Sequence, residues 1–585
     1  MSVADIQLAL VNEWDEAEKF QQWMREPHEW LAIDTETGGL DWWRDDLRLV
    51  QIGDTQKGWA IPWQRWGGIA AQAIENYTSP MVMHNSKFDL HFLEHNGVKV
   101  PRHLIHDTQP MVGLLEPTKS KKLKVASERH VFKGAQAGSQ LLQSVMSKNK
   151  WDWATIPIEC PEYWSYAALD VVLTAGMAKK LYPVISATSA FEAYKYEVAV
   201  AQVLCDMEKQ GIWIDTAYSE QRYEWLDEQE DILREFFKTE MGISNPLADK
   251  QLISWFQSYG YVFTEMTDKG NIKIDQMVLD QIEVGEPSLA EICHTITKVR
   301  NYHKFKSTYF ASFLDLVDDN DRLHTSINPM AAITGRMSAK RPNLQNVPSK
   351  QQGGMVRKAF VASPGHKFIS ADFDQIEYRI MVARAGEQRL IEAIQAGQDL
   401  HTYMTSIVYD KPMESVTPQE REIMKNATFA FLYGAGDAKF SRMAGIQIDQ
   451  AKEFREVYAR QFPAINAYAI RVDREGANGE MIETQYLGRR QAVRKKRDSY
   501  KLLNYVTQGE AGDVLKKKMV ELSMTDIGHH MRLPIHDEIL FEVPEEEIDH
   551  TLEVIQSVMP ENEAFSVPLS VGTEVMSNWG EKYVG

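Results

Sequence analysis

Two segments far apart in the chain each place carboxylates next to apolar residues. Residues 368–379 read FISADFDQIEYR, and their apolar lead-in predicts a buried strand that brings Asp372 to an open edge. Residues 533–543 read LPIHDEILFEV, which predicts a hairpin with Asp537 and Glu538 at its tip. Carboxylates bind hard cations, and two divalent ions about 4 Å apart need carboxylates from separate elements. The two segments therefore predict a two-metal site.

A helix predicted between these segments carries groups suited to a nucleotide. Residues 417–434 read TPQEREIMKNATFAFLYG, where Thr417 and Glu420 fit a capping box and Pro418 suits the first helical position. Four residues recur at every fourth position and share one slowly turning face: Arg421, Lys425, Phe429 and Tyr433. Two cations followed by two aromatic rings suit a triphosphate and a stacked base.

The N-terminal third contains a second set of acids. Asp34 and Glu36 follow the apolar run WLAI and lie on the same side of an extended chain. Asp89 ends the segment MVMHNSKFD, which predicts a strand and then a helix. Tyr166 and Asp170 are four residues apart, so they share one helix face. Four carboxylates and a tyrosine describe a second two-metal site, at which one metal activates water against a phosphodiester.

The composition bounds the class of protein. With 585 residues, 44% of them hydrophobic and 25% charged, the chain is long enough for several globular domains. The net charge of −19 is unusual for a nucleic-acid enzyme, because phosphate contacts come from Lys and Arg. Net charge averages over the whole surface, however, and local basic strips can still form a groove. The specific motifs therefore outweigh the average charge.

Cysteine usage and hydropathy predict a cytoplasmic protein. Cys160, Cys205 and Cys293 are far apart without metal-ligand spacing, which predicts reduced core residues. The N-terminus has no basic region ahead of an apolar core, and no apolar run approaches 18 residues. We therefore expect neither secretion nor membrane insertion.

The three segments between residues 368 and 543 resemble motifs A, B and C of the DNA polymerase I family (family A), as DFDQIEYR, RxxxKxxxFxxxYG and HDE. The resemblance implies that Asp372 and Asp537 hold the catalytic metals and that Glu377 crowds the sugar 2′ position. Other residues implied to contact the nucleotide are Gln375, Arg421, Lys425, Phe429 and Tyr433. His536 and Glu538 would lie near the primer end, and Lys425 and Glu538 would act in catalysis. Asp374 stands where the family usually has serine, so it either perturbs the metal site or faces solvent.

Further segments carry the same resemblance. TGRMS and RPNLQNVP, which begin at residues 334 and 341, resemble the family's TGRxSS and PNLQNIP. Arg336 would contact the primer-side minor groove, where every base pair offers acceptors. Asn343 and Gln345 would lie near the DNA strands, with the alternative that they only tie the loop to the backbone.

Three more polar positions match the family around the active site. His401, in the sequence DLH, matches the family's DIH and would contact the triphosphate. Asn504 and Gln508 match positions that contact DNA. The family's arginine four residues before Asn504 is Tyr500 here, and Lys501 is the candidate substitute.

The N-terminal acids resemble the three exonuclease motifs of the DnaQ-like proofreading family, as DTET, NSKFD and YAALD. The resemblance implies four metal ligands: Asp34, Glu36, Asp89 and Asp170. Tyr166 would orient the attacking water, and Asn85 would contact DNA. Asp107 falls near a family Asp-Thr pair and is interpreted as structural. Since no acid is missing, we expect an active nuclease.

We therefore expect an α/β multidomain chain: an RNase H-like exonuclease domain at 1–185 and a right-hand polymerase domain at 186–585. Residues 186–330 are predicted to be mostly helical, with a helix over 197–211 that stops at Gly211. The thumb would span about 186–325, the palm about 326–395 and 475–585, and the fingers about 396–474. Expected ligands are two Mg²⁺ per active site, with Mn²⁺ as the alternative ion, together with primer-template DNA and deoxynucleoside triphosphates. A replisome or processivity partner stays unidentified. The basic runs at 298–309 and 488–497 predict either phosphate contacts or solvated surfaces.

Three other classes of protein are less compatible with the sequence. A nuclease whose second half only binds DNA would lack one of the metal pair Asp372 and Asp537. A single-subunit RNA polymerase would not need Glu377 or an intact exonuclease, and a replication scaffold would need neither set of acids. No 5′-nuclease segment precedes the motifs, so the chain resembles the short polymerases of bacteriophages and predicts a replicative role in the bacterial cytoplasm.

Overall fold

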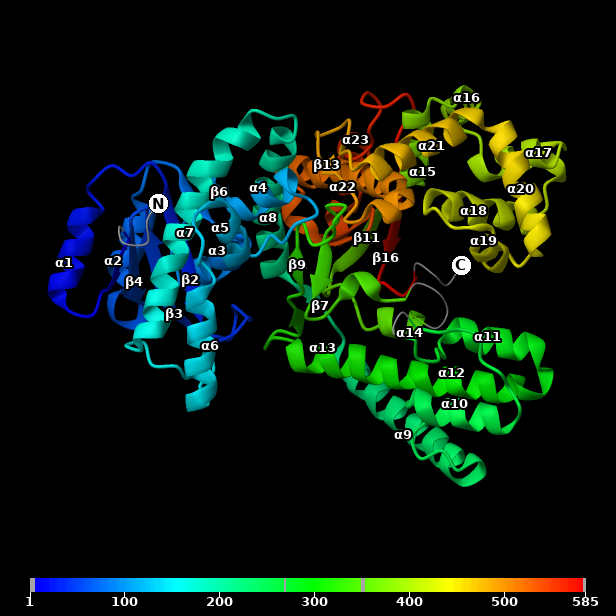
Figure 1. The fold of residues 1–585 in the computed structure, drawn as a ribbon, viewed down its shortest axis with the longest axis horizontal. Coiled ribbons are helices and arrows are strands. Elements are labelled where there is room, and N and C mark those ends of the chain that lie inside the picture. Colours follow the sequence, from blue (N-terminus) through cyan, green and yellow to red (C-terminus); the bar gives the residue numbers. More distant parts are fainter. Residues whose placement is uncertain (1–5, 268–269, 349–352, 582–585) are drawn as a thin grey trace.

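The computed structural model describes residues 6–267, 270–348 and 353–581. An N-terminal part built on a six-stranded sheet lies at one end of the molecule in Figure 1, and a larger C-terminal part follows it. Within the described ranges, no helix is both long and apolar enough to cross a membrane.

The N-terminal sheet has the strand order β1-β4-β3-β2-β5-β6. Strand β2 pairs antiparallel with β3 and parallel with β5, so the strand that carries Asp34 and Glu36 lies inside the sheet. The strands are β1 (Gln7–Leu10), β2 (Leu31–Thr37), β3 (Leu47–Gly53), β4 (Lys57–Pro62), β5 (Met81–Met83) and β6 (Ile105–Asp107). As the sequence predicts, Asp34 and Glu36 lie on an extended strand, and β2 continues through both acids because β3 pairs with it as far as Thr37.

Helices surround this sheet, and α7 packs across β2, β3 and β4. Small and branched residues line the buried length of α7, which allows the helix to lie close to the strands and brings Asp170 to the acids of β2. The helices are α1 (Trp14–Trp23), α2 (Trp63–Glu75), α3 (Ser86–His95), α4 (Thr108–Leu115), α5 (Leu123–His130), α6 (Ala137–Asn149) and α7 (Pro161–Ser186).

Residues 191–316 are mostly helical, as the sequence predicts. Helix α8 ends at Gly211, whose φ of +61° favours glycine, and this is the predicted stop. The following helices pack around a separate core containing Phe237, Phe256 and Ile296. The elements are α8 (Phe191–Gln210), α9 (Thr216–Met241), α10 (Asp249–Ser258), α11 (Gln276–Gly285), α12 (Ala290–Lys304), a π-helix (Phe305–Phe310) and α13 (Ala311–Leu316).

A four-stranded antiparallel sheet of order β14-β15-β11-β16 forms the centre of the C-terminal part. The predicted strand and hairpin are both confirmed, since β11 pairs with β15 and the hairpin turns at His536 and Asp537. The strands are β11 (His366–Phe373), β14 (Met531–Ile535), β15 (Glu538–Pro544) and β16 (Val571–Met576). Helices α15 (Ile376–Ala385), α22 (Leu502–Ser523) and α23 (Ile548–Val558) accompany this sheet.

A second group of helices projects from this sheet on the same side as α10–α12, above them in Figure 1. Helix α18 begins with the predicted capping box, in which Thr417 accepts from the backbone of Glu420 and Glu420 accepts from Thr417. The group consists of α16 (Gln388–Gln395), α17 (Leu400–Val408), α18 (Pro418–Leu432), α19 (Asp437–Ala444), α20 (Ile448–Gln461) and α21 (Pro463–Asn478).

Ion pairs join the two parts of the molecule, and several short elements lie in the larger C-terminal part. Lys87 of α3 donates to Glu208 of α8 at 2.6 Å, and Arg341 donates to Asp41 at 2.6 Å. The short elements are β7 (Ile212–Trp213), β8 (Arg322–Leu323), β9 (Ser326–Asn328), β10 (Ser338–Lys340), α14 (Gly354–Arg357), β12 (Ile482–Glu483) and β13 (Arg490–Gln491). All three cysteines are buried and unpaired, as predicted.

Two candidate active sites

The C-terminal sheet brings Asp372 and Asp537 together at one edge. Register pairs Asp372 of β11 with Glu538 of β15, so Asp537 in the preceding turn lies next to Asp372. The Phe373 amide donates to the Asp537 carbonyl at 3.3 Å, and His536 has a φ of +57° that turns the chain sharply. Two acids 165 positions apart in sequence, by subtraction (537 − 372), therefore meet because two strands pair.

The electrostatics at this edge favour a cation. Burial, and then the neighbouring charge of Asp372, raise the pKa of Asp537 to about 7. Two carboxylates that repel each other in a partly desolvated place are stabilised by a divalent cation, for which carboxylate oxygens are suitable ligands. The donor set therefore fits the metal ions that the sequence implies.

Glu377 lies at the centre of a polar cluster beside these acids. Arg336 forms an ion pair with Oε1 of Glu377, and the hydroxyl of Tyr433 donates to Oε2 at 3.1 Å. Burial raises the pKa of Tyr433 to about 12, with the Glu377 carboxylate adding to the shift. Gln508 of α22 also hydrogen-bonds to the Tyr433 side chain. Three segments that the sequence identified separately thus contact one another through Glu377.

A cavity of about 390 Å³ opens beside this cluster. Two rings of its lining, Phe429 and Tyr433, stack on each other with ring centroids 6.3 Å apart and an angle of 17° between the rings. Its lining contains eight of the predicted site residues: Arg336, Gln375, Glu377, His401, Phe429, Tyr433, His536 and Asp537. The cavity thus combines acids, cations and aromatic faces, as a bound nucleotide requires.

The two cations of α18 lie beside the cavity and not in its lining. Arg421 makes a two-pronged ion pair with Asp399, at 3.0 and 2.8 Å. Lys425 has a loose contact of 3.8 Å with Glu422. His401 is buried close to them, and burial, followed by the charge of Arg421, lowers its pKa to about 4. Arg421 and Lys425 thus form a positive rim on one side of the cavity, next to the neutral imidazole of His401.

Asp374 faces solvent, which is the second of the two alternatives that the sequence leaves open. Its side chain is exposed and accepts a hydrogen bond of 2.7 Å from the hydroxyl of Ser570. Its backbone amide also donates to the carbonyl of Ser570. The carboxylate is thus directed toward Ser570, at the surface.

The side chains predicted to contact DNA differ in their hydrogen-bond partners. Within the described residues, the Oδ1 atoms of Asn343 and Asn504 are buried without a hydrogen-bond partner. Gln345, in contrast, accepts from the amide of Ala339 at 3.1 Å and donates to the carbonyl of Pro534 at 2.9 Å. Gln345 therefore has the loop-tying role that the sequence gave as the alternative. Lys501 lies near Tyr500 and pairs with Asp498 at 3.2 Å.

Neither of the two basic runs, residues 298–309 and 488–497, is a continuous exposed positive surface. In the first, His303 and Lys306 pair with Glu230, and Arg300 pairs with Asp249. Acids that are distant in sequence therefore pair with three of the five basic side chains of this run.

In the second run, Arg489 is 3% exposed and pairs with Glu197 and Asp513 at 2.5 and 2.7 Å. The cations at 494–497 are exposed. The prediction that the whole run faces either phosphate or solvent is wrong for Arg489, because the folded chain places two acids around it.

Sequence reasoning missed the buried network around Glu197 of α8. Lys516 donates to Glu197 at 2.5 Å and to the carbonyl of Gly335 at 2.6 Å. Gln491 donates to the carbonyl of Thr334 at 2.9 Å. The network holds the backbone of the loop that carries Arg336. The available signal was a set of charged residues on an otherwise apolar helix, α22, where partners are required.

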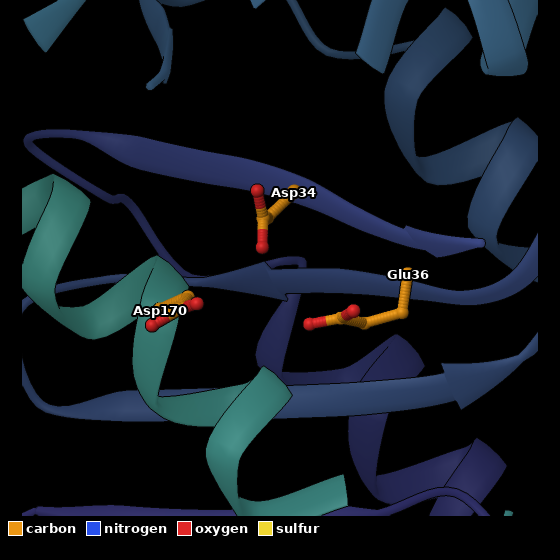
Figure 2. Close-up of side chains that lie close together, drawn as sticks. All are labelled: Asp34, Glu36 and Asp170. Carbon is orange, nitrogen blue, oxygen red and sulfur yellow. The ribbon is translucent and has the colours of Figure 1, made fainter. Parts of the chain in front are cut away.

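The N-terminal acids form the second site. Figure 2 shows Asp34 and Glu36 from β2 and Asp170 from α7 turned toward one space. One carboxylate oxygen from each lies within 4.8 Å of the others. Burial first, and then the neighbouring acids, raise the pKa of Asp34 well above its ordinary value and that of Glu36 to about 8. Crowded, partly desolvated carboxylates of this kind fit a hard divalent cation.

Asp89, the fourth predicted ligand, lies next to this group but is directed elsewhere. It accepts a hydrogen bond of 2.7 Å from the hydroxyl of Thr35, and burial raises its pKa to about 8. It is close enough to Asp34 to raise the pKa of that carboxyl. The structure therefore brings three of the four acids together and keeps the fourth beside them.

Tyr166 and an unpredicted lysine complete the site. Tyr166 hydrogen-bonds to Asp170 one turn along α7, and burial raises its pKa. Lys124 of α5 forms an ion pair with Oδ1 of Asp170, and its ammonium lies 4.1 Å from the centre of the Tyr166 ring. The sequence gave no signal for Lys124, because the packing of α5 against α7 decides its position.

Asn85 precedes α3 in the left-handed region, with a φ of +71°. Asp107 accepts from the amides of Asn85, Ser86 and Gln109 at 3.0, 2.7 and 2.8 Å. Asp107 thus has the structural role that we predict from the sequence, and it fixes the turn that presents Asn85.

Comparisons with known proteins match both parts of the chain to known families. Residues 216–581 match the model described as DNA polymerase family A, and residues 11–186 match the model described as 3'-5' exonuclease. The DNA polymerase of Mycobacterium phage D29 is 28% identical, covering 99% of this chain and 97% of that one. The DNA polymerase of Mycobacterium phage L5 is 29% identical, covering 97% and 96%.

Among solved structures, the POL domain of Pol1 from M. smegmatis, in complex with DNA primer-template and dNTP, aligns with a TM-score of 0.80. Its sequence is 24% identical, and the alignment covers 98% of this chain and 99% of that one. The fold predicted from the sequence is confirmed.

Proposed function

Because the chain belongs to the family A DNA polymerases and carries a 3′–5′ exonuclease domain, we propose specific roles for the residues of its two sites. The chain synthesises DNA on a template and can remove nucleotides from the 3′ end. Both domains belong to metal-dependent families. The proposal concerns which residues perform these reactions, on which ligands and with which ion.

In the polymerase site, Asp372 and Asp537 hold two Mg²⁺ ions. The observation that carries this assignment is the pairing of β11 with β15, which places both carboxylates beside the cavity that Glu377 and Tyr433 line. The chemistry supplied by bound divalent cations, here and in the exonuclease site, is a lowered pKa of the attacking oxygen and stabilisation of charge on the leaving oxygen. Glu538, next to Asp537, lies near the primer end.

The cavity receives a deoxynucleoside triphosphate. Arg421, Lys425 and His401 contact its phosphates from the rim, and Phe429 and Tyr433 pack against the new base pair. Glu377, held from two sides by Arg336 and Tyr433, excludes a 2′-hydroxyl. Gln375, which also lines the cavity, contacts the nucleotide.

Primer-template DNA lies against the palm. Arg336 reaches the primer-side minor groove, and His536 contacts the primer end. Asn343 and Asn504 have buried acceptor atoms without a partner in the described chain, which supports a polar ligand at both places. Gln508 contacts the DNA next to Tyr433, and Gln345 acts by fixing the loop that presents Asn343.

In the exonuclease site, Asp34, Glu36 and Asp170 hold the metal ions. Asp89 joins them when its hydrogen bond with Thr35 breaks. Tyr166 orients the attacking water, and Asn85 holds the strand end. The proposed boundaries are 1–185 for this domain and 186–585 for the polymerase domain.

The similarity to mycobacteriophage polymerases along nearly the whole chain supports a replicative role in a bacteriophage, within the bacterial cytoplasm. The partner that such a role requires is a replisome or processivity factor.

The test is extension of a labelled primer on a DNA template with Mg²⁺ and four deoxynucleotides, repeated without nucleotides. We expect template-directed growth in the first reaction and 3′ shortening in the second. Full extension by Asp372→Asn would refute the polymerase metal assignment, and full shortening by Asp170→Asn would refute the exonuclease one.

A further inference from the structure

Lys124 introduces a positive charge into the exonuclease carboxylate group. Its side chain is 12% exposed, and its ammonium pairs with Oδ1 of Asp170. The ring of Tyr166 covers the same ammonium at 4.1 Å. Helix α5 packs against α7, so the lysine is delivered from a neighbouring helix and not from the segments that carry the acids.

The lysine acts on the whole group of acids. Its ammonium pairs with Asp170, and one carboxylate oxygen of Asp170 lies within 4.8 Å of oxygens of Asp34 and Glu36, so its charge offsets the mutual repulsion of the three acids. An ammonium is a compact point charge on a flexible stem, so it can withdraw from a carboxylate without disturbing the backbone. Lys124 competes with a divalent cation for Asp170, and its positive charge also repels a cation that the same carboxylates hold.

We propose that Lys124 is an internal counter-ion of the exonuclease carboxylates that exchanges with a divalent metal ion at Asp170. The proposal rests on the metal site assigned above, and it adds that metal binding there is weakened by a cation belonging to the chain. The exonuclease consequently requires a higher metal concentration than it would without Lys124. The polymerase site has no part in this exchange.

Metal binding itself provides the first test. Mn²⁺ binding to the full chain is measured by electron paramagnetic resonance of free Mn²⁺, with Asp372→Asn and Asp537→Asn present to weaken the polymerase site. We expect Lys124→Met and Lys124→Gln to bind Mn²⁺ about tenfold more tightly, and Lys124→Arg to remain within about threefold of the parent. Lys122→Met is the matched control, since Lys122 is an exposed lysine two residues earlier, and it should leave the affinity unchanged.

Thermal unfolding provides a second readout that does not depend on activity. In a chelator, Lys124→Met should melt at a lower temperature than the parent, because the acids lose their counter-ion. In saturating Mn²⁺ this difference should shrink or reverse, since ligand binding stabilises the tighter-binding variant more. A variant with a packing defect alone would stay destabilised in both conditions, which would contradict the proposal.

Exonuclease assays in the otherwise native chain give the functional outcome. The Mg²⁺ concentration for half-maximal shortening should fall by about tenfold in Lys124→Met, while that for primer extension stays unchanged. Unchanged or weaker Mn²⁺ binding by both Lys124→Met and Lys124→Gln would overturn the proposal, provided that Asp170→Asn loses binding. If Asp170→Asn also binds normally, the metal site itself is misassigned.

Discussion

The hydroxyl of Tyr433, at the end of α18, donates a hydrogen bond of 3.1 Å to Oε2 of Glu377, at the start of α15. Arg336 pairs with the other oxygen of the same carboxylate. The side chain proposed to test the sugar is thus held from two sides, by Tyr433 at the end of α18 and by the loop that carries Arg336. The side chains proposed for sugar selection, base stacking and minor-groove contact therefore meet at one carboxylate.

Removing this carboxylate should admit ribonucleotides. Glu377→Ala should raise ribonucleotide incorporation relative to deoxynucleotides by about a hundredfold, because space for the 2′-hydroxyl opens. Tyr433→Phe loses only the hydrogen bond and should raise it by about fivefold. Single-nucleotide extension kinetics measure both. Tyr486→Phe, which removes a tyrosine–carboxylate hydrogen bond to Glu561 outside this cavity, is the control; equal selectivity in all variants would remove Glu377 from this role.

A single substitution should slow one of the two reactions and leave the other almost unchanged. Asp34→Asn should slow 3′ shortening by at least about a thousandfold, equivalent to about 4 kcal/mol, and leave extension within about twofold. Asp537→Asn should do the reverse, because each acid serves one site only. Parallel extension and shortening assays on the same preparations make each variant the control for the other. Loss of both activities in either variant would point to misfolding or to a shared site.

Asp374→Ser, which restores the residue usual in the family, should change the rate of synthesis by no more than about threefold. The reason is that the Asp374 carboxylate is exposed and bonded to Ser570. Steady-state extension across a Mg²⁺ titration measures this, with Asp372→Ser as the inactive counterpart. A large shift in the Mg²⁺ requirement of Asp374→Ser would show that this acid acts on the metal site.

The loop that carries Arg336 should depend on Gln491. Gln491→Met removes the hydrogen bond to the Thr334 carbonyl at nearly constant volume, which loosens the loop that holds Arg336 against the minor groove. We therefore expect about a fivefold to tenfold gain in extension of mismatched primer ends. The measurement is made with Asp34→Asn present, so that editing does not hide the effect. Gln556→Met, which removes a comparable side-chain bond to the carbonyl of Val571, should leave mismatch extension unchanged.

Glu542 should make stability depend on pH. It is buried in β15 and accepts from the amide and hydroxyl of Ser363 and from Arg532, and despite its burial these bonds lower its pKa to about 2. Because the folded pKa lies below the ordinary value of 4.5, the stabilisation is present above pH 4.5 and is lost as pH falls toward 2.

Glu542→Gln should therefore lower the free energy of unfolding by about 3 kcal/mol at pH 7, with the difference from the parent fading between pH 4.5 and pH 2. Denaturant unfolding over this range measures the difference. Glu545→Gln, which affects only a long exposed ion pair with Lys367, is the control and should show almost no effect. A difference that stays constant across pH would mean that the charge of Glu542 is not the cause.

Local patterns in the sequence determined many of the elements of this protein. The capping box of Thr417 and Glu420, the hairpin turn before Glu538 and the stop at Gly211 depend on residues a few positions apart, so the sequence predicted them directly. The same holds for the two sets of acids, because their types and order along the chain characterise two families before any fold is known.

Only the tertiary structure decided which partner each of those residues meets. Asp89 turns to Thr35, Arg489 is buried between Glu197 and Asp513, and Lys124 reaches Asp170 from another helix. Asp374 likewise accepts a hydrogen bond from Ser570, which is 196 positions away in the sequence. Burial and long-range pairing set the charge state and direction of a polar side chain, and neither can be read from neighbours in sequence. The sequence by itself therefore determined the chemistry available, and the packing of distant elements determined where each charge acts.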